Sequence, residues 1–91
     1  MNAKGEIQVS ISDEILRGTY SNQIVISHSR GEFVMDCMMV FPPKGITGAR
    51  VIVSPGHAKR LLKALQNNIA TYEKSYGEIP EEAPPAPNLL N

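Results

Sequence analysis

The sequence predicts an α+β protein: an antiparallel meander of four strands, then one long C-terminal helix packed on the sheet, then a disordered tail. Three observations predict this fold. Four short segments are rich in alternating or β-branched apolar residues, and short connections join them, which favours antiparallel neighbours. One later segment repeats apolar residues at helical spacing. The last fifteen residues hold four of the seven prolines and three glutamates but no basic residue, a composition typical of disorder.

The length and composition of the chain limit its organisation. Its 91 residues suffice for one small domain. We expect a flexible N-terminus over residues 1–4, a single domain over residues 5–77 and a disordered tail over residues 78–91. No apolar run approaches the roughly 18 residues that a membrane-spanning helix needs. The single cysteine cannot form an internal disulfide, and the first residues lack the apolar stretch of a secretory signal. We therefore expect a reduced, cytoplasmic protein.

The first expected strand covers residues 6–11, where apolar and polar residues alternate strictly. The residues that this alternation places on one face are Ile7, Val9 and Ile11. Ser12-Asp13-Glu14 is a typical helix start, and Gly18 is a suitable C-terminal stop. About one helical turn fits between them.

The next three strands form the rest of the expected meander. Residues 23–28 contain β-branched residues that favour a pleated sheet. A short loop leads to the third strand, residues 32–41, which Pro42-Pro43 ends. Residues 44–48 are expected to form a loop, and residues 49–53 the fourth strand.

The long helix is expected to follow directly. Ser54 is a suitable N-cap, Pro55 fits the first helical position, and Gly77 is the expected stop. Apolar residues recur between them at helical spacing and predict one apolar stripe. The residues of this apolar stripe are Ala58, Leu61, Leu62, Leu65, Ile69, Tyr72 and Tyr76.

The third strand predicts a partner, because it is apolar on both faces. Five residues from Phe33 to Phe41 line one face, which the helix is expected to cover. A solvated second face would normally be polar. The residues expected on that second face, our candidate oligomer face, are Val25, Val34, Asp36, Met38, Val40 and Ile52. One helix cannot cover both faces, so we expect a second copy of the chain, most simply in a dimer. The alternative is that the N-terminal segment folds over this face.

Six stretches of the sequence form a specific combination of motifs. They are Gly18-Thr19-Tyr20-Ser21-Asn22, Ile26-Ser27-His28-Ser29, Glu32-Phe33-Val34-Met35-Asp36, the run from Ser54 to Ile69 with Pro55-Gly56-His57-Ala58-Lys59-Arg60-Leu61-Leu62, Tyr72-Glu73 and Tyr76-Gly77. In these stretches the sequence resembles a family of short bacterial proteins, domain of unknown function 3467. The resemblance implies a stand-alone cytoplasmic bacterial protein. It implies no activity, substrate or catalytic residue.

The formal net charge is zero, but the acidic tail leaves a body of about +3. Basic residues gather where the helix begins, although the helix dipole favours acids there. An anion would offset that placement, held by the amides of Gly56 and His57 with Lys59 and Arg60. The alternative is a solvated, lysine-rich helix face. The residues that we consider candidates for contact with an anion, a nucleic acid or a partner are Arg30, Arg50, His57, Lys59, Arg60 and Lys63.

The residues give little indication of a catalytic site or a metal-binding site. His28, Ser29 and Asp36 lie close in sequence, but nucleophilic catalysis also needs an oriented base and an oxyanion site. The His and Cys residues lack the close pairing typical of zinc sites. Cys37 fits an apolar row and is expected to be an inert core thiol. Asp36 is expected either to reach water or to pair with a base such as Arg50.

Two classes of function fit the sequence. The first is a non-enzymatic, homo-oligomeric adaptor that binds another protein and needs no cofactor. The second is a nucleic-acid-binding protein that uses a basic face of the helix and sheet, although aromatic residues make up only 5% of the chain. The C-terminal Asn88-Leu89-Leu90-Asn91 is either a short docking motif or an idle terminus.

Overall fold

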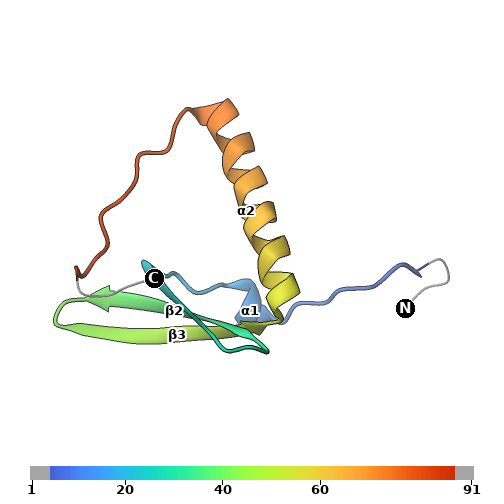
Figure 1. Cartoon of the computed structure of the whole chain (residues 1–91), viewed down its shortest axis with the longest axis horizontal. Helices are drawn as coiled ribbons and strands as arrows, with labels where there is room; N and C mark the ends of the chain where they lie inside the picture. Colours follow the sequence, from blue (N-terminus) through green and yellow to red (C-terminus); the bar gives the residue numbers. More distant parts are fainter. Residues whose placement is uncertain (1–4, 88–91) are drawn as a thin grey trace.

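The computed structural model describes residues 5–87 of the chain and contains three strands and two helices in this range (Figure 1). The elements in chain order are α1 (Asp13–Leu16), β1 (Gln23–His28), β2 (Phe33–Phe41), β3 (Lys44–Val53) and α2 (Pro55–Tyr76). The α+β class is confirmed. The flexibility expected of residues 1–4 and the docking motif proposed for residues 88–91 lie outside the described residues.

The three strands form one antiparallel sheet in the order β1-β2-β3. The predicted strands over residues 23–28 and 32–41 are confirmed, because β1 has the expected bounds and β2 begins one residue later. Short loops join neighbouring strands, as an antiparallel meander requires. β2 is therefore the central strand, and β1 and β3 are the edges.

The first of the four expected strands, over residues 6–11, is not formed. Residues 6–12 contain no helix or strand, and Figure 1 shows this segment running away from the sheet. Ile7 is 72% exposed and Val9 is 89% exposed, so the segment does not cover a sheet face either. The alternation identifies residues suited to a sheet, but a strand also needs a neighbour that takes its backbone hydrogen bonds.

The expected loop over residues 44–48 belongs instead to β3. Pro42 and Pro43, joined by a cis peptide bond, make a two-residue turn, so Lys44 pairs directly with Phe41. Two glycines in this stretch weaken its strand signal in the sequence. One of them, Gly48, is the extra residue of a β-bulge, because Cys37 and Met38 of β2 pair with the residues on either side of it.

The segment between α1 and β1 is tied to the sheet by its own side chains. Ser12 caps α1, and Gly18 follows it with φ +75°, so the predicted start and stop are confirmed. The Ser21 hydroxyl donates a hydrogen bond of 2.7 Å to the Met38 carbonyl oxygen. The Asn22 carboxamide bonds both backbone groups of Val40, donating at 3.0 Å and accepting at 2.8 Å. The Ser-Asn pair thus extends the sheet beyond the first residue of β1.

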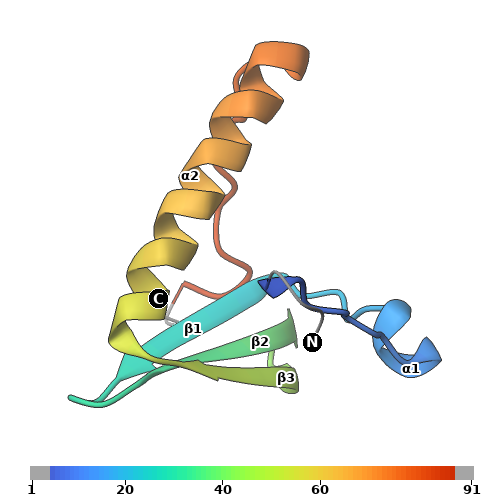
Figure 2. The ribbon, with the colours of Figure 1, turned by 90° about the vertical axis from the view of Figure 1, so that its right-hand side faces the viewer.

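Helix α2 forms where the sequence predicts it. The Ser54 hydroxyl accepts a hydrogen bond from the His57 amide at 3.1 Å, Pro55 occupies the first turn, and Gly77 ends the helix with φ +92°. The helix does not pack on the sheet of its own chain, contrary to prediction. Figures 1 and 2, a quarter-turn apart, both show it rising from the end of β3 and leaving the sheet.

The described residues contain almost no hydrophobic core. Among residues 5–87, only Val40, Ala86 and Gln23 are buried, and no side chain is fully buried. The radius of gyration is 16.3 Å, against about 12 Å for a compact domain of this length. Because α2 leaves the sheet, neither the helix nor the sheet supplies the other with a covering layer.

Candidate functional site

The strand register sorts the side chains of the sheet onto two faces. Paired residues of neighbouring strands point to the same face, and successive residues of one strand alternate. Cys37 pairs with Ile24 and Ala49, while its neighbour Asp36 pairs with Arg50. We name the two faces after these two β2 residues. The apolar residues of the Cys37 face are Ile24, Ile26, Phe33, Met35, Cys37, Met39, Phe41, Ile46, Ala49, Val51 and Val53.

The Asp36 face contains the residues predicted as the candidate oligomer face. The register places on it Val25, Val34, Asp36, Met38, Val40 and Ile52, together with Arg50, Gln23, Ser27, Gly45 and Thr47. Their shared side of the sheet is therefore confirmed. Their part in an oligomer stays a prediction.

The Cys37 face and the predicted apolar stripe of α2, which runs from Ala58 to Tyr76 and is hereafter the α2 stripe, leave large apolar side chains open to solvent. On the sheet, Ile26 is 50% exposed and Val51 is 46% exposed. On the helix, Leu62 is 56% exposed and Leu65 is 55% exposed. Soluble monomers rarely expose contiguous apolar patches larger than a few hundred Å². Exposed apolar surfaces of this kind are typical of sites that contact another molecule.

The Asp36 face differs because an ion pair crosses it. The Arg50 guanidinium donates two hydrogen bonds to the Asp36 carboxylate, Nε to Oδ1 at 2.6 Å and Nη2 to Oδ2 at 3.0 Å. These bonds hold the pKa of the Asp36 carboxyl below its usual value, against the opposing effect of desolvation. The predicted pairing is thus confirmed, and it occupies a base that we had considered for nucleic-acid contact.

The other candidate basic residues are divided between two places. Arg30 lies in the loop between β1 and β2, whereas the rest lie at the start of α2, where the first turn contains no acid. Lys59, Arg60 and Lys63 are exposed, and no carboxylate of residues 5–87 pairs with them. The His57 amide already donates to Ser54, so the predicted anion cradle loses one of its two amides. Contact with an anion stays a prediction for the three exposed cations.

His28 makes a contact within the sheet. Its imidazole stacks on the ring of Phe33, the paired residue of β2, with a centroid distance of 5.4 Å and an interplanar angle of 26°. Within residues 5–87, no three His, Cys, Asp or Glu side chains gather closely enough to hold a metal ion.

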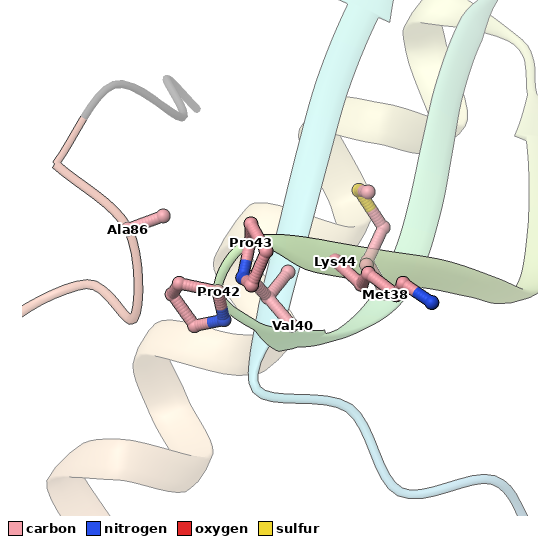
Figure 3. A pocket seen from close by; sticks show the side chains of 7 residues that line it. Met38, Val40, Pro42, Pro43, Lys44 and Ala86 are labelled. Carbon is pink, nitrogen blue, oxygen red and sulfur yellow. The ribbon is translucent and has the colours of Figure 1, made fainter.

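A hollow of about 420 Å³ lies beside the turn between β2 and β3 (Figure 3). Val40 and Met38 line it from the Asp36 face, Pro43 lines it from the turn, and Ala86 closes it from the C-terminal segment. Residues 78–87 form no helix or strand, but Ala86 is only 9% exposed. The composition of the tail does not predict the position of Ala86 beside the turn, because this position depends on the path by which residues 78–87 return to the sheet. The disorder expected of the tail stays a prediction.

Ser21 and Asn22 were not predicted to have a role, yet their side chains form hydrogen bonds with backbone groups of Met38 and Val40 near the end of β2. The signal was present, because Ser and Asn directly before a strand are residues whose side chains bond to nearby backbone. Thr19, two residues before Ser21, lies so close to the bulge that a Cβ on Gly48 would be 2.8 Å from the Thr19 Cγ2. The Gly-Thr-Tyr-Ser-Asn stretch therefore has a structural role.

The fold and the surfaces together define a small α+β protein with a three-stranded antiparallel sheet, a protruding C-terminal helix and exposed apolar surfaces on both. The chain belongs to the family described as Protein of unknown function (DUF3467), which matches residues 1–81. Searches among curated proteins and among solved structures found no significant match. In the described part of the chain, neither helix is long and apolar enough to cross a membrane.

Proposed function

We propose that this protein is a non-enzymatic interaction module that acts as a homo-oligomer, in which each copy supplies the covering layer that the other lacks. The observation that supports this most directly is the absence of a core among residues 5–87. A chain that buries so little apolar surface cannot offset the entropy lost on folding. A second copy offers the same exposed surfaces and doubles the apolar area available for burial.

The surface area of the chain supports a large contact. The single copy exposes 8276 Å², whereas a compact monomer of its 10.0 kDa mass exposes about 5,200 Å². The excess is about 3,000 Å² per chain. Obligate homodimers bury about 1,000–2,500 Å² on each partner. The exposed area is thus more than sufficient for an obligate contact between two copies.

The test is the molar mass and its dependence on concentration. Sedimentation equilibrium of the full chain at micromolar concentration is expected to give twice the chain mass of 10.0 kDa. Urea unfolding is expected to shift to higher midpoints as the protein concentration rises, because folding and association are coupled. A folded monomer at micromolar concentration, with an unfolding midpoint independent of concentration, would refute the proposal.

A second candidate function is binding of nucleic acid, which the exposed cations at the start of α2 favour. Lys59, Arg60 and Lys63 lie on one helix without carboxylate partners in residues 5–87. Phosphate contacts weaken with salt by roughly one log unit per log of salt for each contact. Anisotropy of labelled oligonucleotides should then fall steeply between low and physiological salt, and Lys59→Glu with Arg60→Glu should abolish binding. No binding at low salt would rule this function out.

A further inference from the structure

We infer that the α2 stripe of one copy packs across the Cys37 face of a second copy, and that the second copy's α2 does the same in return. The inference rests on the proposed homo-oligomer and names the surfaces that form it. It commits to one occupant for the open sheet face: the helix of another chain of the same sequence.

The connection between β3 and α2 directs the helix away from its own sheet. β3 ends at Val53 and α2 begins at Pro55, so Ser54 alone joins them. Ser54 is also the N-cap, and its hydroxyl and carbonyl oxygens accept hydrogen bonds from the His57 and Ala58 amides at 3.1 and 2.9 Å. Laying α2 on its own sheet would require this one capped residue to reverse the chain. The cap would be lost, at a cost of about 1 kcal/mol.

The helix and the open sheet face match in length. α2 has 22 residues, which corresponds to about 33 Å at 1.5 Å per residue. β2 has nine residues, which corresponds to about 30 Å. A helix of this length therefore spans the whole central strand, and the α2 stripe, which is about 27 Å long from Ala58 to Tyr76, covers most of the length of the Cys37 face.

The two surfaces also match in chemistry. No residue of the α2 stripe is charged, and the central rows of the Cys37 face hold no charged residue either. The opposite face carries the Asp36–Arg50 ion pair, which an apolar helix would have to desolvate without replacing its contacts with water. The Cys37 face is therefore the side of the sheet that an apolar helix can cover at the lower cost.

The centre of the Cys37 face is shaped for a large side chain. Cys37, the middle residue of β2, lies beside Ala49 of β3, and both side chains are small. Larger residues, Met35 and Met39, precede and follow Cys37 on the same face. Leu65 lies at the middle of α2 and is 55% exposed. When the middle of α2 lies over the middle of β2, Leu65 fills the depression left by the small side chains of Cys37 and Ala49. This holds whether the helix runs parallel or antiparallel to the strand.

The native cysteine allows a direct test with a short bismaleimide that joins two nearby thiols. In the full-length Leu65→Cys variant, the reagent is expected to link Cys37 of one copy to position 65 of the other. The main denatured product then doubles in mass from 10.0 kDa. The unchanged chain and the double variant Leu65→Cys with Cys37→Ala, which each have one thiol, are expected to stay single. Asn67→Cys, on the opposite side of α2, is the matched control and is also expected to stay single.

Each other result overturns the inference in a recognisable way. A linked product of single-chain mass means that α2 folds onto its own sheet. A covalent dimer in the double variant means that the two helices contact each other instead. A dimer by sedimentation with no link in Leu65→Cys refutes the packing but leaves the proposed homo-oligomer standing. A monomer by sedimentation refutes both. Circular dichroism and sedimentation of each variant before labelling establish that the substitutions leave fold and mass unchanged.

Discussion

Leu62→Ala is expected to weaken the dimer without weakening the isolated helix. Leu62 lies in the α2 stripe and is 56% exposed in the single chain, so about half of its burial is left for association. Full burial of a leucine is worth about 1.5–3 kcal/mol, which leaves about 1 kcal/mol for each copy. A symmetric dimer contains the residue twice, so the loss is about 2 kcal/mol, or roughly a thirty-fold rise in Kd.

The assay is urea unfolding at several protein concentrations, combined with sedimentation equilibrium to obtain Kd. Asn67→Ala is the matched control, because it lies on the opposite side of α2 and introduces the same residue. Alanine is the better helix former at both positions, so helix propensity cannot explain a loss in Leu62→Ala. The control is expected to change Kd by less than about three-fold, in keeping with ordinary surface substitutions. Equal Kd values for the two variants would refute the reasoning.

Three further predictions concern the sheet and its entry segment. Because the pKa of Asp36 is lowered in the folded chain, the stabilising effect of its carboxylate is complete above the ordinary pKa of about 3.9 and is lost as the pH falls below it. The free energy of unfolding, measured in urea from pH 6 to pH 2, should therefore vary less with pH in Asp36→Asn than in the unchanged chain. Parallel pH profiles of the two proteins would contradict this. Gly48→Ala places a Cβ 2.8 Å from Thr19 Cγ2 and should lower the free energy of unfolding by about 1–3 kcal/mol. Adding Thr19→Ala to this variant should recover part of the lost Tm. A double variant no more stable than Gly48→Ala would rule out this contact as the cause. Gly18 has φ +75°, so Gly18→Ala should lower the free energy of unfolding by about 1–2 kcal/mol. Gly31 has open space around it and no positive φ, so Gly31→Ala should leave Tm nearly unchanged. Equal losses of stability in the two variants would show that the backbone conformation at Gly18 is not the reason.

The two faces of the sheet now carry different expectations. The sequence predicts that a second copy covers the Asp36 face, because the helix of the same chain is expected to cover the Cys37 face. In the structure α2 covers neither face of its own chain. Ala86 and the hollow lie on the Asp36 side at the turn, and the ion pair lies near its middle. The central rows of the Cys37 face hold no charged residue, and this face therefore takes the helix in our inference.

The predictions that succeeded rest on local physics. Ser54 accepts a hydrogen bond from the backbone two or three residues on, and Gly77 adopts a positive φ, whatever the rest of the chain does. The same holds for the β-branched run of β1 and for the alternation of β2. The Asp36–Arg50 pair was also predictable, because residues paired across neighbouring strands of one face lie within reach of each other.

The predictions that failed depended on contacts between distant segments. Residues 6–11 have the alternation of a strand, but no neighbouring strand takes their hydrogen bonds. Residues 44–48 looked like a loop because of their glycines. The turn at Pro42-Pro43 nevertheless brings them opposite the end of β2, where their backbone groups find partners.

The sequence by itself determined the α+β class, the bounds of α2 and β1, the caps and the residues that share a sheet face. These depend on the spacing of apolar residues and on side chains that bond to nearby backbone. Only the tertiary structure decided that α2 leaves the sheet, that Gly48 is a bulge and that Ala86 closes a hollow. An apolar stripe indicates that one side of a helix must be covered, but it does not specify which surface covers it. Which surface covers it depends on the path of the backbone at Ser54, which the spacing of apolar residues does not encode.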